Sequence, residues 1–175
     1  MSYNRELGAK IRADLKAAGI PARAVSVRVS DAGYSTSVRV NIKDISIDRD
    51  VVEKIAYRHK DISYDERSGE ILSGGNTYVF VEYDYDMIRN ATNQYIEQAQ
   101  EIIDGNNQPC VGVDIATRDD GSRLVFFYEA PNSAHNIAVI FDKDGHYDYS
   151  KDRHVAHNAY HLARALALYN AVGHF

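Results

Sequence analysis

The chain has 175 residues, of which 45% are hydrophobic and 26% are charged, with three Pro, eleven Gly, one Cys and no Trp. This composition is ordinary for a compact soluble protein that buries a core without needing a disulfide or a metal. The formal charge of −5 is uneven, because residues 1–43 carry eight basic and three acidic side chains. No apolar run approaches the roughly 20 residues of a membrane helix, and no signal peptide is evident, so we expect a cytoplasmic protein.

The first half of the sequence predicts two helices and three strands. Apolar residues spaced by four predict an amphipathic helix over residues 3–18. Two segments in which Val or Ile alternates with polar residues, 25–29 and 38–42, flank a glycine-containing turn and predict a β-hairpin. Asp48 is placed to cap a short second helix. The next strand, residues 77–83, is apolar on both faces, which predicts a position in the middle of a sheet.

The second half predicts a helix, four strands and a final helix. The first helix should cover residues 87–103, where apolar residues recur at three and four. Three strands separated by turn sequences follow, at residues 110–117, 123–130 and 136–142. A further hairpin turn should lead into a fourth strand at residues 147–149. The last helix should run over residues 152–172 and stop at Gly173.

These elements predict an α+β fold. Their order is α-β-β-α-β, followed by α-β-β-β-β-α, which indicates a mostly antiparallel sheet with helices gathered on one side. We expect two lobes, residues 1–86 and residues 87–175, packed as one compact unit.

Basic residues of the first lobe form the first candidate site, which is for nucleic acid. They are Arg5, Arg12, Lys16, Arg28 and Arg39. If the outer face of the first helix adjoined the polar face of the hairpin, these side chains would form a stripe able to follow a phosphate backbone. A helix packed on a sheet would instead leave the two basic faces on opposite sides, so both arrangements remain open.

Tyrosines alternating with aspartates form a second candidate site, which is for a protein partner. They are Tyr83, Asp84, Tyr85 and Asp86 in the first lobe and Tyr147, Asp148 and Tyr149 in the second. Such side chains suit an arginine-rich surface, since Tyr is enriched at recognition sites. The alternative is that they cover the ends of strands.

Three histidines in HVAHNAYH could bind a metal if they lie on a helix. His154, His157 and His161 would then share one stripe, as metal-binding histidines at i and i+4 do. The glutamate that follows the first histidine of a zinc protease pair is absent, because Asn158 follows His157. A solvated face or a histidine-lined partner surface is the alternative, and no cofactor is expected.

A segment from Asp142 to Asp148 superficially resembles a calcium-binding loop. The spacing is incomplete, because Gly145 comes two positions early and Arg153 stands where a bidentate Glu is needed. We therefore expect an ordinary hairpin turn.

Residues 5–85 resemble the large polyvalent protein-associated domain numbered twenty-nine in its series. The resemblance rests on three segments: ELGAKIRADLKAAGI, AVSVRVSDAGYSTSVRVNIKD and DVVEKIAYRHKDISYDERSGEILSGGNTYVFVEYD. Members of that family similarly open with a helix, continue with a hairpin containing Tyr-Ser, and place a short helix before a final strand. Such domains occur in proteins of phages and conjugative elements that blunt host defence.

The resemblance implies a mobile-element anti-defence protein, similar in kind to anti-CRISPR inhibitors. It would bind a host CRISPR-Cas nuclease or its guide or target nucleic acid and prevent cleavage by occupation, without being an enzyme. One alternative is a nucleic-acid-binding accessory module of phage or plasmid replication. Another is a metal-dependent enzyme built on the three histidines.

Overall fold

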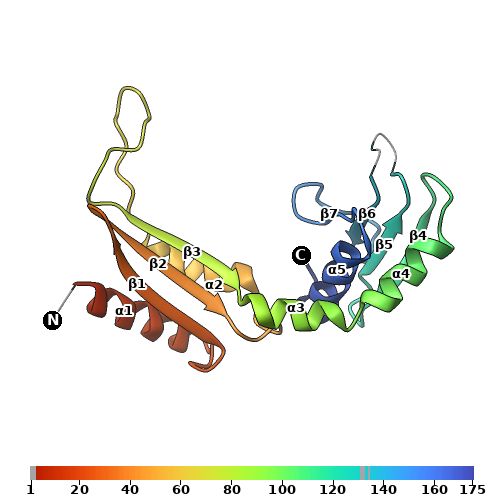
Figure 1. The fold of residues 1–175 in the computed structure, drawn as a ribbon, viewed down its shortest axis with the longest axis horizontal. Coiled ribbons are helices and arrows are strands. Elements are labelled where there is room, and N and C mark those ends of the chain that lie inside the picture. Colours follow the sequence, from red (N-terminus) through yellow and green to blue (C-terminus); the bar gives the residue numbers. More distant parts are fainter. Residues whose placement is uncertain (1–2, 131–132, 134) are drawn as a thin grey trace. The chain divides into compact units, whose positions relative to one another are not determined.

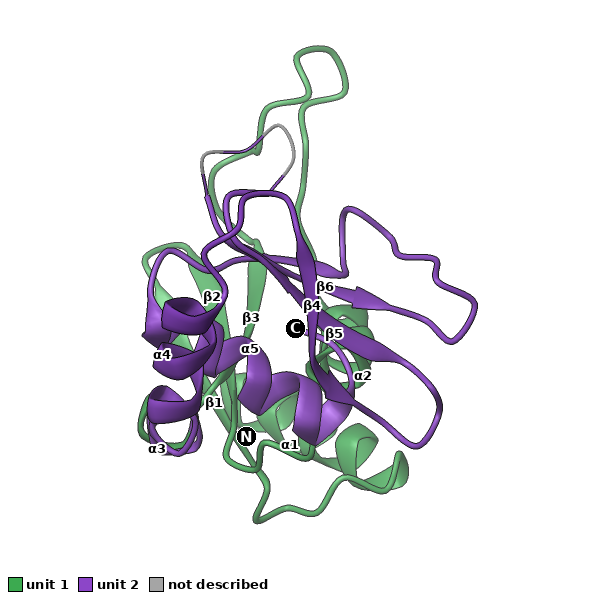
Figure 2. Ribbon diagram, turned by 90° about the vertical axis from the view of Figure 1, so that its right-hand side faces the viewer, with its two compact units in different colours: residues 1–87 green, residues 88–175 purple. Residues whose placement is uncertain are grey.

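The computed structural model describes residues 3–130, 133 and 135–175. The chain divides into two compact units, residues 1–87 and 88–175 (Figure 2). Each unit has its own sheet and hydrophobic core. The described residues form an α+β fold with a three-stranded mixed sheet and a four-stranded antiparallel sheet, which confirms the predicted fold class. No helix among them is long and apolar enough to cross a membrane.

The first unit contains one sheet and two helices that cover one of its faces. In chain order its elements are α1 (Tyr3–Ala17), β1 (Val25–Ala32), β2 (Ser35–Ile42), α2 (Arg49–Ala56), the 3₁₀ turn η1 (Tyr57–His59) and β3 (Thr77–Tyr83). The strands lie in the order β1-β2-β3, with β1 antiparallel to β2 and β3 parallel to β2 (Figure 1). Ile11 and Leu15 of α1, Val52 of α2 and the valines on one face of the sheet form the core.

The expected cap of α2 is present. The side chain of Asp48 accepts hydrogen bonds from the backbone N–H groups of Asp50 and Val51, at 2.7 and 3.4 Å. These bonds satisfy donors that have no partner within the first turn of a helix, which explains why α2 begins at Arg49.

The predicted position of β3 is wrong, because this strand lies at the edge of its sheet. Val79 and Val81 are buried against the helices, whereas Phe80 on the other face leaves 47% of its surface exposed. One face of β3 is apolar because it is buried, whereas the other face is apolar because it carries the exposed ring of Phe80.

The second unit has helices on one face of an antiparallel sheet. Its elements, beginning with the helix in which the division between the units falls, are α3 (Tyr85–Asn93), α4 (Ile96–Gly105), β4 (Gly112–Thr117), β5 (Arg123–Phe127), β6 (Ile137–Phe141), β7 (Arg153–Val155) and α5 (Ala159–Val172). The strands follow one another in the order β4-β5-β6-β7. Leu124, Phe126 and Ile140 pack with α4 and α5 around the fully buried Tyr169. The fourth strand is β7, and residues 147–149, where the sequence predicts it, lie in the preceding loop.

The single helix predicted over residues 87–103 is two helices. The hydroxyl of Thr92 donates to the carbonyl of Ile88 at 2.7 Å, and the N–H of Tyr95 bonds back to the carbonyl of Thr92. Bonding of a Thr side chain to the carbonyl four residues earlier bends helices, and α3 ends one residue after Thr92. No Gly or Pro lies at this break, and apolar residues keep their helical spacing on both sides of it. The sequence pattern therefore predicts one continuous helix.

The final helix is also shorter than predicted over residues 152–172. Its expected first turn pairs with β6 as a strand, with Val155 opposite Ile137. The helix begins only after Asn158, whose side-chain oxygen accepts from the N–H of His161 at 3.1 Å. The strand pairing and the Asn cap together prevent the helix from extending toward the N-terminus.

Candidate functional site

The first unit presents one face of its sheet without a covering helix from that unit. Arg28 of β1 lies directly opposite Arg39 of β2, which lies opposite Phe80 of β3. All three side chains are exposed, because alternate residues of a strand point to opposite faces and the intervening valines face α1 and α2. We call this row of Arg28, Arg39 and Phe80 the open-face row.

The open-face row joins positive charge to a flat aromatic surface. Like charges directly opposite each other in a ladder are destabilising, so Arg28 and Arg39 are not explained by the stability of the hairpin. Asn41 and Glu82 line a shallow hollow of about 180 Å³ together with Arg39 and Phe80. This arrangement can pair with phosphates, stack on a planar ring and offer hydrogen-bonding groups to the edge of that ring.

The five predicted basic residues do not form one stripe. Helix α1 packs on the face of the sheet opposite Arg28 and Arg39, so its exposed residues Arg5 and Lys16 lie on the other side of the unit. The guanidinium of Arg12 donates to the backbone carbonyl of Val27 at 2.9 Å. Packing of the helix on the sheet therefore separates the two basic groups, and Arg28 and Arg39 share the open face with Phe80.

The acidic and aromatic residues at the end of β3 have roles within the fold. The hydroxyl of Tyr83 donates to the carbonyl of Ile47 at 3.1 Å, and burial raises the pKa of this Tyr. Asp84 accepts from the N–H of Met87 at 3.3 Å, at the start of α3. Asp86 lies in the first turn of the same helix, and Tyr85 is 70% exposed. Tyr83 and Asp84 thus end the strand and begin the helix.

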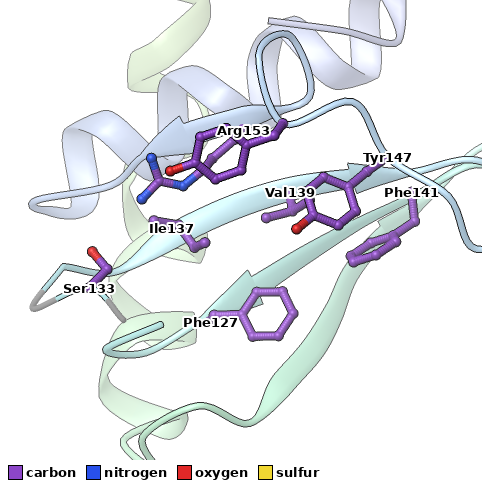
Figure 3. A pocket seen from close by; sticks show the side chains of 8 residues that line it. Phe127, Ser133, Ile137, Val139, Phe141, Tyr147 and Arg153 are labelled. Atoms are coloured by element: carbon purple, nitrogen blue, oxygen red, sulfur yellow. The ribbon is translucent and has the colours of Figure 1, made fainter. Parts of the chain in front are cut away.

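The second unit contains a hollow on the face of its sheet that α4 and α5 leave uncovered. Its volume is about 370 Å³, and it is lined by Phe127, Ser133, Ile137, Val139, Phe141, Tyr147, Tyr149 and Arg153. Figure 3 shows the rings of Phe127, Phe141 and Tyr147 around this hollow, with Arg153 entering from β7. We call it the aromatic pocket.

Ring contacts order the wall of the aromatic pocket. The rings of Phe141 and Tyr147 meet edge to face, with centroids 5.1 Å apart. The guanidinium carbon of Arg153 lies 5.1 Å from the centroid of the Tyr149 ring. Tyr147 and Tyr149, predicted as partner-binding residues, therefore lie beside aromatic and cationic groups that the sequence analysis did not select.

The loop that carries these tyrosines, residues 142–152, is held by two aspartate-centred turns. Asp142 accepts from the N–H groups of Asp144 and His146, and these bonds, that of His146 first, lower its pKa. Asp148 accepts from both the hydroxyl and the N–H of Ser150, which lowers its pKa as well. The calcium-like segment is therefore a hydrogen-bonded turn, as expected, and the Asp148 carboxylate is engaged within the loop.

The three histidines do not share a helix. His154 is on β7, His157 is in the connection to α5, and His161 is in the first turn of α5. The rings of His157 and His161 meet at 5.5 Å, and that of His157 also meets His135 at 4.8 Å. Among the described residues of the second unit, no three His, Cys, Asp or Glu side chains bring their ligand atoms within 4.8 Å of one another.

Burial dominates the chemistry of His154. Its Nε2 atom is buried and has no hydrogen-bond partner among the described residues. Desolvation, assisted by the nearby charge of Arg164, lowers the pKa of His154 to about 4. This imidazole is therefore neutral at pH 7 and belongs to the sheet face that packs against α5.

Sequence reasoning missed the phenylalanines at both sites. Phe80 alternates with Val79 and Val81, so the period of two placed it correctly opposite the valines but could not tell exposure from burial. Phe127 and Phe141 are the last residues of β5 and β6, where they pair with Ile137 and Arg123, and Arg153 was assigned to a helix. A search for aromatic residues on the face opposite the core would have found Phe127 and Phe141.

Comparisons of the chain with known protein families, curated proteins and solved structures found no match. No protein-family model matches the chain, no curated protein matches it, and no solved structure matches its fold.

Proposed function

We propose that the protein acts by binding, and that its first unit contacts single-stranded nucleic acid through the open-face row. The observation that carries this proposal is the alignment of Arg28, Arg39 and Phe80 across three neighbouring strands. Two guanidinium groups offer charge to phosphates, and an exposed ring offers a stacking surface to a base. A base that is already unstacked can reach such a flat surface, whereas the bases inside a duplex cannot.

The proposed setting is the infection of a bacterial host by a phage or other mobile element, in which the protein counteracts the defence of the host. It would inhibit a CRISPR-Cas nuclease, or a similar DNA-targeting complex, by occupying the complex or its guide or target nucleic acid in the host cytoplasm. The resemblance of residues 5–85 to a domain of mobile-element proteins supports this setting. Occupation requires complementary surfaces instead of a reaction centre, and the open-face row is such a surface.

The second candidate function is an accessory module of phage or plasmid replication that binds single strands by itself. The same row favours it, because charge and stacking are tolerant of sequence and need no protein partner. The two candidates differ in whether a nuclease is required for tight binding.

Titration of labelled single strands and duplexes at several salt concentrations tests the nucleic-acid contact. We expect single strands to bind more tightly, and the double variant Arg28→Thr/Arg39→Thr to reduce the salt slope by about 2. Phe80→Ala should weaken binding about tenfold through lost stacking. The matched control Lys54→Gln/Arg58→Gln also removes two positive charges from exposed residues, but these lie on α2 and η1 and not on the open face of the sheet. Equal losses in the control would show that net charge, and not the row, is responsible.

A cleavage assay distinguishes the two settings. The tagged chain is used to capture nucleases from bacterial lysates that express defence systems, and each captured nuclease is then assayed with its nucleic acid. Inhibition that is lost in the Arg28→Thr/Arg39→Thr variant supports the anti-defence function. Salt-sensitive binding of free single strands, with no inhibition of any captured nuclease, favours the accessory module instead.

A further inference from the structure

The aromatic pocket of the second unit has the size and walls of a small-ligand site. Its volume of about 370 Å³ lies within the range of roughly 300–1,000 Å³ common for such sites. Phe127 and Phe141 provide flat walls from β5 and β6, and Tyr147 provides a third from the adjoining loop (Figure 3). Flat walls of this kind favour a planar ring over a branched aliphatic group.

One cation without a counter-ion lies at this pocket. The guanidinium of Arg153 stacks on Tyr149, and among the described residues it has neither an ion pair nor a hydrogen bond. By contrast, Arg123 on the same sheet face is bound to the carboxylate of Asp114 at 3.0 Å. Stacking fixes the plane of the Arg153 guanidinium while leaving its N–H donors available for an anion.

The loop over the pocket is already ordered. The N–H of Asp148 bonds to the carboxylate of Asp152 at 2.7 Å, and the N–H of Asp152 bonds back to the carbonyl of Asp148 at 2.8 Å. Because Tyr147 and Tyr149 flank Asp148, these bonds hold both rings near the pocket before any ligand binds. A preorganised wall reduces the entropy that binding must overcome.

We propose that the aromatic pocket binds a nucleobase that carries a phosphate, with the base between the aromatic walls and the phosphate on Arg153. The same chemistry is offered by a free mononucleotide and by the 5′-terminal nucleotide of a strand. This site does not depend on the proposed function, because it lies in the second unit and uses none of the residues of the open-face row.

Calorimetric titration with adenosine 5′-monophosphate, adenosine and inorganic phosphate tests the proposal on the full chain. We expect the nucleotide to bind at least about tenfold more tightly than either fragment, because a charged hydrogen bond is added to stacking. Arg153→Gln should abolish the preference for the nucleotide over adenosine. Tyr149→Ala removes a side chain that is 67% exposed and lies outside the core, and it should weaken the binding of both the nucleotide and adenosine. Arg164→Gln on α5 is the matched control, and it should change the affinity for neither the nucleotide nor adenosine.

A short strand with or without a 5′-phosphate, titrated into the Arg28→Thr/Arg39→Thr variant, identifies the source of the ligand. Binding of the phosphorylated strand that depends on Arg153 assigns the pocket to strand ends, and binding of the mononucleotide alone assigns it to free nucleotides. Both results support the proposal. Equal affinity for adenosine and its monophosphate, no binding of any nucleotide, or tighter binding of decanoate or of a peptide ending in Phe would overturn it. Phe80→Ala should leave nucleotide binding at the aromatic pocket unchanged. A failure of the proposal for the aromatic pocket can therefore be distinguished from a failure of the proposal for the open-face row.

Discussion

Arg28 and Arg39 face each other directly across the β1–β2 ladder. Since opposed like charges destabilise a hairpin, Arg39→Thr should raise the free energy of unfolding by about 0.2–1 kcal/mol. The same change should weaken the binding of single-stranded nucleic acid, so stability and binding move in opposite directions. Urea denaturation and a binding titration on one protein preparation measure both.

The control for this pair is Arg39→Lys, which keeps the charge and its repulsion. It should leave stability nearly unchanged and should weaken the binding of single-stranded nucleic acid less than Arg39→Thr does, because the charge is kept while the planar guanidinium is lost. A loss of stability in Arg39→Thr would mean that the guanidinium packs usefully within the first unit, and the explanation by charge repulsion would be wrong.

Gly112 allows Phe127 to lie against β4. A Cβ atom at Gly112 would lie 2.7 Å from the Cε1 atom of Phe127 and 3.1 Å from a methyl group of Val125. Gly112→Ala should therefore displace the ring, cost about 1–3 kcal/mol of stability, and weaken any ligand of the aromatic pocket. Thermal unfolding and nucleotide titration check the two effects.

Gly105→Ala is the matched control, because a Cβ atom there meets nothing within 4 Å. It should leave ligand binding unchanged and should keep or raise stability, by up to about 1 kcal/mol, because Gly105 is a helical residue without a positive φ. If the two alanine variants behaved alike, the close approach of Gly112 to Phe127 would have no energetic consequence.

Arg118 ties a loop to the end of α5. Its guanidinium donates to the carbonyls of Tyr169 and Asn170 at 2.8 and 3.2 Å, where the last carbonyls of a helix lack partners. Arg118→Ala should lower the free energy of unfolding by about 1–3 kcal/mol. Chemical denaturation measures the loss, and Arg118→Lys should recover part of it because a cation at this helix end remains favourable. Equal stability of all three proteins would contradict this role.

The sequence was sufficient for features that depend on local spacing. The valine alternation of β1 and β2 and the cap at Asp48 are in the structure where predicted. The left-handed Gly173, with φ of 88°, ends α5 as expected. Each of these follows from interactions within a few residues, which is why a single sequence reveals them.

The remaining features depend on contacts between distant segments. Val155 is a strand residue because Ile137 pairs with it, and no local pattern separates this segment from the first turn of a helix. The separation of Arg28 and Arg39 from Lys16 is likewise set by which face of the sheet α1 covers. The candidate sites were therefore predicted only in part, since residues were selected from charge and composition while their neighbours came from tertiary packing.

His154 should make stability depend on acidity in one direction. Its pKa is lowered from 6.5 to about 4, chiefly by burial and then by Arg164 and His161, so between these values the unfolded chain binds a proton that the folded chain does not. Stability is therefore complete above pH 6.5 and falls toward pH 4, by up to about 3 kcal/mol.

His154→Gln, which cannot titrate, isolates this contribution from the carboxylates that also respond to acid. Urea denaturation at pH 7.5 and pH 4.5 should show a smaller loss of stability in the variant than in the parent chain. The difference between the two proteins, and not either loss alone, is the quantity that reports on His154. An identical loss in both would mean that the imidazole is protonated within the folded chain, and that its position against α5 is more hydrated than its buried Nε2 atom indicates.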